Sequence, residues 1–167
     1  MNTNPRTSPL ELTFRSKLRQ DDVVETPACL YEELDAIFHF TFDPAPVAPT
    51  QDGLAIEWGE SNFINPPFSA IEPWVRRGAE SGKQCVFLLP LRSSSRYWRK
   101  WVWPYAQAMY FLTDAVQFKG FRNPLSIPIV IVVMHAPAAS PPPVITSLGG
   151  IAVVTMRPDR SSDDDAM

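Results

Sequence analysis

The sequence predicts an α/β protein built around a largely parallel sheet, and three observations carry this prediction. Short β-prone runs alternate with amphipathic segments from residue 28 onward, which is the order typical of parallel strands joined by helical crossovers. Residues 84–89 carry no charge and are apolar after Gln84, as expected of a central strand that is covered on both faces. The pattern closes with a hairpin that includes the β-branched run 129–135, which predicts one antiparallel strand near a sheet edge.

Two segments show the helical pattern clearly. An apolar stripe with acidic residues opposite it predicts a helix over residues 28–38, and Pro27 suits the start of that helix. Ser69 can cap a second helix, and Gly82 can end it. The buried side of this second helix is expected to consist of Ile71, Trp74, Val75 and Ala79.

The other patterned segments predict one more helix, several strands and a long loop. The third helix is expected to begin at Ser94 or Ser95 and to stop before Pro104. Residues 44–60 contain three prolines and no helical stripe, so they predict a loop. The runs that predict strands are 39–42, 63–64, 84–89, 108–112, 116–118 and 129–135.

The composition divides the chain into an arm, one domain and a tail. Residues 1–20 have no clear period and predict a flexible N-terminal arm, whereas residues 21–136 hold the folded domain. Residues 137–167 predict a Pro-rich linker, then a strand at 150–155 and a disordered acidic tail.

Charge and cysteine content limit the classes of function. The net charge of −3 and the pI near 5.3 exclude a globally basic coat for nucleic acid. Two scattered cysteines and two histidines predict neither a metal site nor a disulfide scaffold, which favours an intracellular compartment. Cys85 is expected in the core. The polar N-terminus lacks a signal peptide and the longest apolar run, 127–134, is too short to span a bilayer, so we expect a soluble protein without a membrane partner.

The chemically most informative stretch is Asn65-Pro66-Pro67-Phe68, between a predicted strand and a predicted helix. Ligands of open α/β sheets bind at such turns, at the carboxyl ends of strands. Pro66 and Pro67 fix φ twice and remove two N–H donors. A rigid amide, free carbonyls and the Phe68 ring remain, which suits recognition of an exocyclic amino group on a planar ring.

These residues, together with several other segments, resemble a known enzyme family. Asn65-Pro66-Pro67-Phe68 resembles motif IV of the amino-group N-methyltransferases. Glu25-Thr26-Pro27 is similar to motif X, and Phe42-Asp43-Pro44-Ala45 is similar to motif I. As a set, covering about residues 20–136, they resemble the phage-type DNA N6-adenine methyltransferases (Dam-like). Further matching features are Asp52-Gly53-Leu54, Trp58, Trp74-Val75, Leu88-Leu89-Pro90 and Arg92.

The resemblance implies a reduced Rossmann-like class I methyltransferase sheet with flanking helices. Only a short loop separates Asp43 from the strand before Asn65, where a full enzyme has two further βα units that form one sheet edge. Their loss leaves the strand order 1-4-5-7-6, with the last strand antiparallel. Pro44, Pro46 and Pro49 replace the family's Gly-rich loop, and the usual acidic contact to the cofactor ribose has no counterpart.

The implied activity is transfer of a methyl group from S-adenosyl-L-methionine (SAM) to N6 of adenine in DNA. The Asn65 side-chain oxygen and the Pro66 carbonyl would accept the two N–H groups of the amine, and Phe68 would stack on the base. A base in duplex DNA must flip out to reach such a site. The resemblance assigns cofactor binding to Thr26, Pro27, Asp43, Pro44, Ala45 and Asp52.

A basic and aromatic segment follows the strand 84–89. Between Ser81 and Thr113 there is no acidic residue, and cations interleave with aromatic side chains. Such a segment suits phosphate contacts and base stacking, and we expect it on the same rim as the Asn65 turn. The candidate nucleic-acid contacts are Arg92, Arg96, Trp98, Arg99 and Lys100.

Residues 144–156 could pair with another subunit.

Simpler structural roles and other functions stay open at this point. Asn65 to Phe68 could be only a stiff turn, Asp43 and Asp52 could be turn residues, and Trp98 could pack on the sheet. The basic set could be a solvated face. One alternative function is a non-catalytic relative that binds nucleic acid or protein; another is a methyltransferase for RNA adenine or a protein amide. A phage-encoded chain would act in the host cytoplasm.

Overall fold

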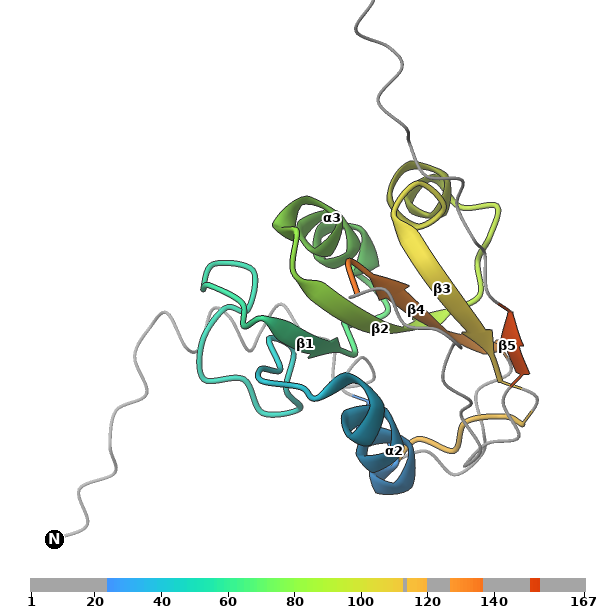
Figure 1. The fold of residues 1–167 in the computed structure, drawn as a ribbon, viewed down its shortest axis with the longest axis horizontal. Coiled ribbons are helices and arrows are strands. Elements are labelled where there is room, and N and C mark those ends of the chain that lie inside the picture. Colours follow the sequence, from blue (N-terminus) through green and yellow to red (C-terminus); the bar gives the residue numbers. More distant parts are fainter. Residues whose placement is uncertain (1–23, 113, 120–126, 137–150, 154–167) are drawn as a thin grey trace, which may run out of the picture.

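The computed structural model describes residues 24–112, 114–119, 127–136 and 151–153 (Figure 1). The predicted arm at 1–20 and almost all of the predicted linker and tail lie outside these residues. The described elements, in chain order, are α2 (Ala28–Phe38), β1 (Ser61–Ile64), α3 (Ile71–Ser81), β2 (Gln84–Pro90), the π-helical turn η2 (Trp98–Val102), β3 (Ala106–Phe111), β4 (Ile129–Met134) and β5 (Ile151–Val153).

The strands form one mixed sheet in the order β1-β2-β4-β3-β5. β1 pairs with β2 in parallel, whereas β4 runs antiparallel to both β2 and β3. β5 lies antiparallel to β3 of the same chain; it contains the described part of the segment 144–156 that was expected to meet another subunit. The predicted α/β class with flanking helices is confirmed. The sheet is mixed and not largely parallel, however, and the antiparallel strand β4 lies in the middle of the strand order and not near an edge.

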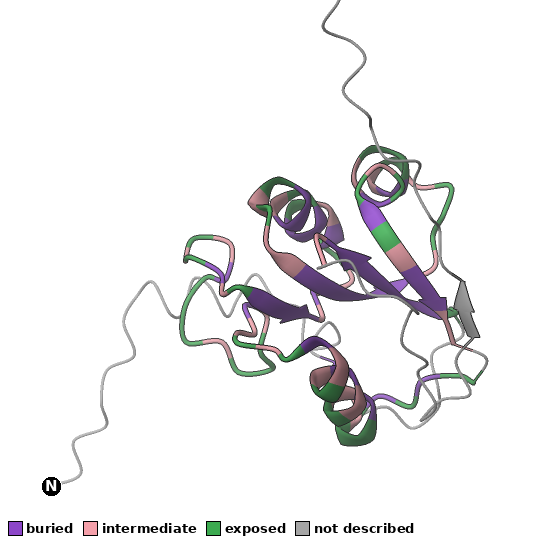
Figure 2. Ribbon diagram, in the orientation of Figure 1, coloured by how far each residue is buried: buried purple, intermediate pink, exposed green. Residues whose placement is uncertain are grey.

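Helices cover the sheet on both faces (Figure 1). Side chains alternate along β2, so Phe87 and Leu89 pack beneath α3 and η2, whereas Val86 and Leu88 face α2. Purple dominates the central strands in Figure 2, because these strands are buried from both sides. Cys85 belongs to this core, and burial raises the pKa of its thiol to about 11.

Both clearly predicted helices are confirmed. α2 begins after Pro27, and its end is closed by His39 in the left-handed conformation, whose N–H donates to the Asp35 carbonyl. Gly82, at φ 66°, ends α3 as its position in the pattern predicts. Ala70, not Ser69, occupies the position before the first turn of α3.

Three predicted elements take a different form. Residues 39–42 make a single parallel bridge, Phe42 with Asn62, because the Thr41 hydroxyl accepts the Ser61 N–H that a longer ladder would bond to a carbonyl. The predicted third helix is present over residues 96–102, but its last five residues take the wider π-helical form η2, in which the Trp103 N–H donates to the Trp98 carbonyl. Residues 116–118 form no strand; instead, Val116 and Phe118 are buried on the α2 side of the sheet.

Candidate functional site

A cavity of about 230 Å³ lies at the carboxyl end of β1, between the start of α2 and the loop after Phe42. It unites three stretches that are distant in sequence. Four of the predicted site residues line it: Thr26, Asp43, Ala45 and Asn65. The remaining lining residues are Val24, Glu25, Ala28, Tyr31, Glu32, Val47 and Phe63.

The Asn65 amide is held from one side only. Its Nδ2 donates to the Val24 carbonyl oxygen at 2.7 Å and to the Thr26 Oγ1 at 3.1 Å. Its Oδ1 is buried and has no hydrogen-bond partner among the described residues. An unpaired buried acceptor costs about 1–3 kcal/mol, so an N–H donor that reached this oxygen would stabilise it.

Asp43 gives the cavity a second acceptor. Its Oδ1 accepts the Ala45 N–H at 2.9 Å, which closes the turn after the Phe42 bridge. Burial raises the pKa of the Asp43 carboxyl from 3.8 to about 6, although this hydrogen bond opposes the shift. Among the described residues that line the cavity none is a cation, so a positively charged ligand would find a complementary carboxylate.

The strap formed by residues 24–26 is fastened on its other side to residues 118–119. The Lys119 N–H donates to the Glu25 carbonyl at 3.1 Å, and Lys119 Nζ lies 2.9 Å from Glu25 Oε1. The Phe118 ring meets the edge of Phe68 with ring centroids 6.1 Å apart. The two sequence motifs at 25–27 and 65–68 are therefore also joined through a third segment, residues 118–119.

The other motif residues support the cavity without lining it. Pro66 is buried. Phe68 is half-buried and contacts the apolar core on both faces of the sheet, the one under α3 and η2 and the one under α2. The Pro27 carbonyl accepts the N–H groups of Leu30 and Tyr31, in the first turn of α2.

The Pro44 and Asp52 positions serve the loop rather than the cavity. Pro44 is buried, and its carbonyl would lie 1.8 Å from a Cβ at Gly53, so only glycine fits there. Asp52 is exposed, and its Oδ1 accepts the Leu54 N–H at 2.9 Å. Asp52 thus acts as a turn residue and does not line the cavity that contains Thr26, Asp43 and Asn65.

The structure divides the predicted nucleic-acid residues into core and surface. Trp98 is fully buried, and its Nε1 donates to the Tyr97 hydroxyl at 3.1 Å. Its ring belongs to the core beneath α3 and η2, so Trp98 takes the core position that its helical spacing also allows. Four cations of the set are exposed: Arg92, Arg96, Arg99 and Lys100.

These cations do not all share the rim of the cavity. Arg92 follows the carboxyl end of β2, the edge at which Asn65 also lies. The chain then crosses the face of the sheet, because Ala106 pairs with Met134, which pairs with Cys85 at the start of β2. Arg92 therefore lies at the expected edge of the sheet, the one at which Asn65 lies. The chain from there to Tyr105 leads to the opposite edge, where β2 begins.

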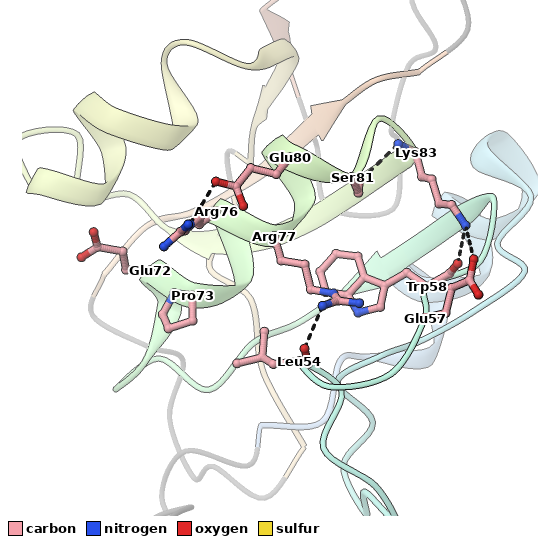
Figure 3. Close-up of a pocket in the computed structure, with 10 residues that line it drawn as sticks. All are labelled: Leu54, Glu57, Trp58, Glu72, Pro73, Arg76, Arg77, Glu80, Ser81 and Lys83. Carbon is pink, nitrogen blue, oxygen red and sulfur yellow. Dashed lines mark hydrogen bonds and ion pairs between the residues drawn. The ribbon is translucent and has the colours of Figure 1, made fainter.

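Sequence reasoning missed a larger groove of about 760 Å³ along α3 (Figure 3). Two of its cations bond the loop before β1. Arg77 donates to the carbonyls of Leu54 and Ile56, and its guanidinium lies 5.3 Å from the centroid of the Trp58 ring. Lys83 Nζ binds the Trp58 carbonyl at 2.7 Å. The charged outer face of α3 was the available signal. The groove is lined by Leu54, Glu57, Trp58, Glu72, Pro73, Arg76, Arg77, Glu80, Ser81 and Lys83.

The described residues include neither a cluster of metal-ligating side chains nor a helix suited to span a membrane. There, no three His, Cys, Asp or Glu side chains gather closely enough to hold a metal ion. Within the same ranges, none of the helices has the length and apolarity needed to cross a membrane. Comparisons with protein-family models, with curated proteins and with solved structures find no match to the chain.

Proposed function

We propose that this protein is a SAM-dependent methyltransferase that acts on N6 of adenine in DNA. The single observation that carries the proposal is the unpartnered, buried Oδ1 of Asn65 beside a cavity that also contains Asp43. One motif thus contributes an unoccupied acceptor, and a second contributes a carboxylate to the same cavity.

The sheet order supports the same function. If the Phe42 bridge is the remnant of strand 1, then β1, β2, β4 and β3 correspond to strands 4, 5, 7 and 6 of the methyltransferase sheet. The antiparallel direction of β4 agrees with the reversed seventh strand of that sheet.

On the acceptor side, Asn65 would orient the amine without acting as a strong base. The adenine amino nitrogen is a poor nucleophile, because its lone pair is delocalised into the ring. Accepting one N–H at Asn65 Oδ1 and the other at the Pro66 carbonyl would hold the nitrogen toward the methyl donor and stabilise the charge that develops on it. Phe68 would contact the face of the base.

On the cofactor side, the cavity would bind the cationic end of SAM, which supplies the methyl group. Asp43 and Glu25 offer carboxylates, and Thr26 offers a hydroxyl. A cation beside Asp43 would favour its ionised form and offset the burial that raises its pKa. At about 230 Å³ the cavity is below the usual size of a small-molecule site, so it suits one end of the cofactor.

DNA would reach this site along the exposed cations. Arg92 begins the path at the rim, and Arg99 and Lys100 continue it over η2. Their charges would contact phosphates and position the duplex, and the target adenine would flip out toward Asn65.

The test is methyl transfer from labelled SAM to unmethylated DNA by the unaltered protein, Asn65→Ala and Asn62→Ala. Asn62 is the matched control, since it is a buried amide of β1 whose Nδ2 bonds the Gly59 and Gln84 carbonyls and does not line the cavity. Asn65→Ala is expected to slow transfer by about 10²–10³-fold, while Asn62→Ala transfers methyl in proportion to its folded fraction. Equal labelling by the unaltered protein and Asn65→Ala would overturn the role of Asn65.

The second candidate is a non-catalytic module that binds nucleic acid or protein. It is favoured by residues 44–60, which replace the Gly-rich loop and two βα units by a proline-bearing loop. Calorimetry with SAM separates the two, because a module of this kind shows no binding heat at millimolar SAM. Competition between DNA, RNA and amide substrates separates DNA methylation from RNA adenine or protein amide methylation.

A further inference from the structure

We infer that Thr26 and the backbone carbonyl of Val24 fix the Asn65 amide as a pure acceptor, which makes Thr26 a positioning residue that sets the choice of base. This inference rests on the proposed function. It concerns a contact between the strap at residues 24–26 and the turn after β1, which the individual motifs do not contain.

The orientation of the amide follows from what its neighbours can accept. The Val24 carbonyl can only accept a hydrogen bond, and it lies 2.7 Å from Asn65 Nδ2. The reversed amide would place two oxygen acceptors at that short distance, where they repel. The nitrogen therefore faces the strap, and Oδ1 takes the opposite direction.

Thr26 uses the second donor of the same amide. Its Oγ1 lies 3.1 Å from Asn65 Nδ2, so both N–H groups of the amide have partners. An asparagine side chain can usually both donate and accept toward a ligand. With both donors engaged, Asn65 can offer only the unpartnered Oδ1.

The strap is itself held in place, which keeps this orientation stable. Glu25 lies between the two contact residues and is bonded to Lys119 through its backbone carbonyl and its carboxylate. Pro27 follows directly, and its carbonyl accepts two N–H groups in the first turn of α2. Rotation of the Asn65 amide would therefore break its hydrogen bonds to Val24 and Thr26, because the strap is held in place and does not move with the amide.

An Asn65 side chain held in this way would select purine bases that carry a hydrogen-bond donor at position 6. Adenine carries an amino group there and can donate to Oδ1, whereas hypoxanthine carries an oxygen that would face it. Sites built to bond a donor reject analogues that lack it, because the buried polar group is then left unpaired. Thr26 would thus contribute to base discrimination without contacting the base.

The test compares Thr26→Val with Thr26→Ser, and uses Thr41→Val as the matched control. Thr41 Oγ1 bonds the Ser61 backbone and does not line the cavity, so its loss reports the cost of removing a hydroxyl elsewhere. The probes are thymine oligonucleotides with one central adenine or one central hypoxanthine, measured for affinity with SAM present.

The unaltered protein, Thr26→Ser and Thr41→Val are expected to prefer adenine by about tenfold or more. Thr26→Val is expected to reduce this ratio to about two- to threefold, because the freed N–H lets the amide rotate. An unchanged ratio in Thr26→Val overturns the positioning role alone. No preference in the unaltered protein overturns the proposed function together with it.

A second measurement follows the amide directly and does not depend on activity. In the unaltered protein and in Thr26→Ser, both side-chain N–H protons of ¹⁵N-labelled Asn65 are expected to exchange slowly with solvent. Thr26→Val is expected to accelerate exchange of one of them at least tenfold, since one of its two partners is lost. Equal exchange in all three proteins overturns the inference.

Discussion

Lys119 holds Glu25 twice, through a backbone hydrogen bond of 3.1 Å and an ion pair of 2.9 Å. These contacts attach the strap at residues 24–26 to a segment far along the chain. The strap carries Thr26, whose hydroxyl bonds the Asn65 amide. Lys119 is therefore linked to Asn65 through the strap. A residue that does not line the cavity thus holds one of its walls in place.

Lys119→Met is expected to weaken SAM binding more than it weakens folding. The ion pair is exposed, so its loss should cost only about 0–1 kcal/mol of unfolding free energy. The strap would lose its side-chain anchor, and we expect the Kd for SAM, measured by calorimetry, to rise about three- to tenfold. Arg76→Met is the control, because it breaks an exposed pair with Glu80 on the other face. An equal rise in both variants would contradict the role of the strap.

The raised pKa of Asp43 predicts the direction in which the free energy of unfolding changes with pH. Its pKa is raised from 3.8 to about 6 in the folded chain, so the folded state binds this proton more tightly than the unfolded state. The stability due to the protonated carboxyl is fully present below about pH 4 and is lost as the pH rises through 6. After allowance for solvent access, the loss is on the order of 1–2 kcal/mol.

Asp43→Asn tests this dependence. The variant should unfold at higher denaturant than the unaltered protein near pH 7.5, and the difference should shrink toward pH 4. The same variant should bind SAM at least tenfold more weakly, because the cavity loses its buried carboxylate. A gain in stability with unchanged SAM affinity would separate Asp43 from cofactor binding.

Trp98 and Trp103 belong to the same turn but differ in burial, so we expect their replacement by alanine to lower the unfolding free energy by different amounts. Trp98 is fully buried, so Trp98→Ala should lower the unfolding free energy by about 3–5 kcal/mol. Trp103 is 42% exposed, and Trp103→Ala should cost clearly less. Urea unfolding followed by circular dichroism measures both, and equal costs would contradict the placement of Trp98 in the core.

The exposed cations of η2 predict salt-dependent binding of DNA. Arg99→Gln and Lys100→Gln should each weaken affinity for duplexes of any sequence and lower the slope of log K against log salt by about 1. Lys83→Gln is the control, since Lys83 is engaged with Glu57, Glu60 and the Trp58 carbonyl. A slope that changes equally in the control would assign the effect to net charge alone.

The local elements were readable from the sequence because short-range chemistry fixes them. Pro27 and one apolar stripe define α2, and Gly82 ends α3 in a conformation that suits glycine. The predicted turn at Asn65 follows β1 directly, as expected. These features depend on neighbours within a few positions.

The parts that sequence reasoning missed depend on long-range contacts. The Asn65 amide bonds Val24, 41 positions away, and Glu25 bonds Lys119, 94 positions away. No local pattern signals such pairs. Trp98 illustrates the same limit, since its spacing suits either a core or a ligand contact until the sheet beneath it is known.

The most direct measurement of the central claim is methyl transfer by Asn65→Asp beside Asn65→Ala and Asn62→Ala. The Asn65→Asp variant would keep an acceptor but lose the N–H donors that bind Val24 and Thr26. If the held amide oxygen orients adenine, Asn65→Ala slows transfer from labelled SAM by about 10²–10³-fold, Asn65→Asp is intermediate, and Asn62→Ala follows its folded fraction. Transfer by folded Asn65→Ala at the unaltered rate, with the label on adenine N6, would contradict the account.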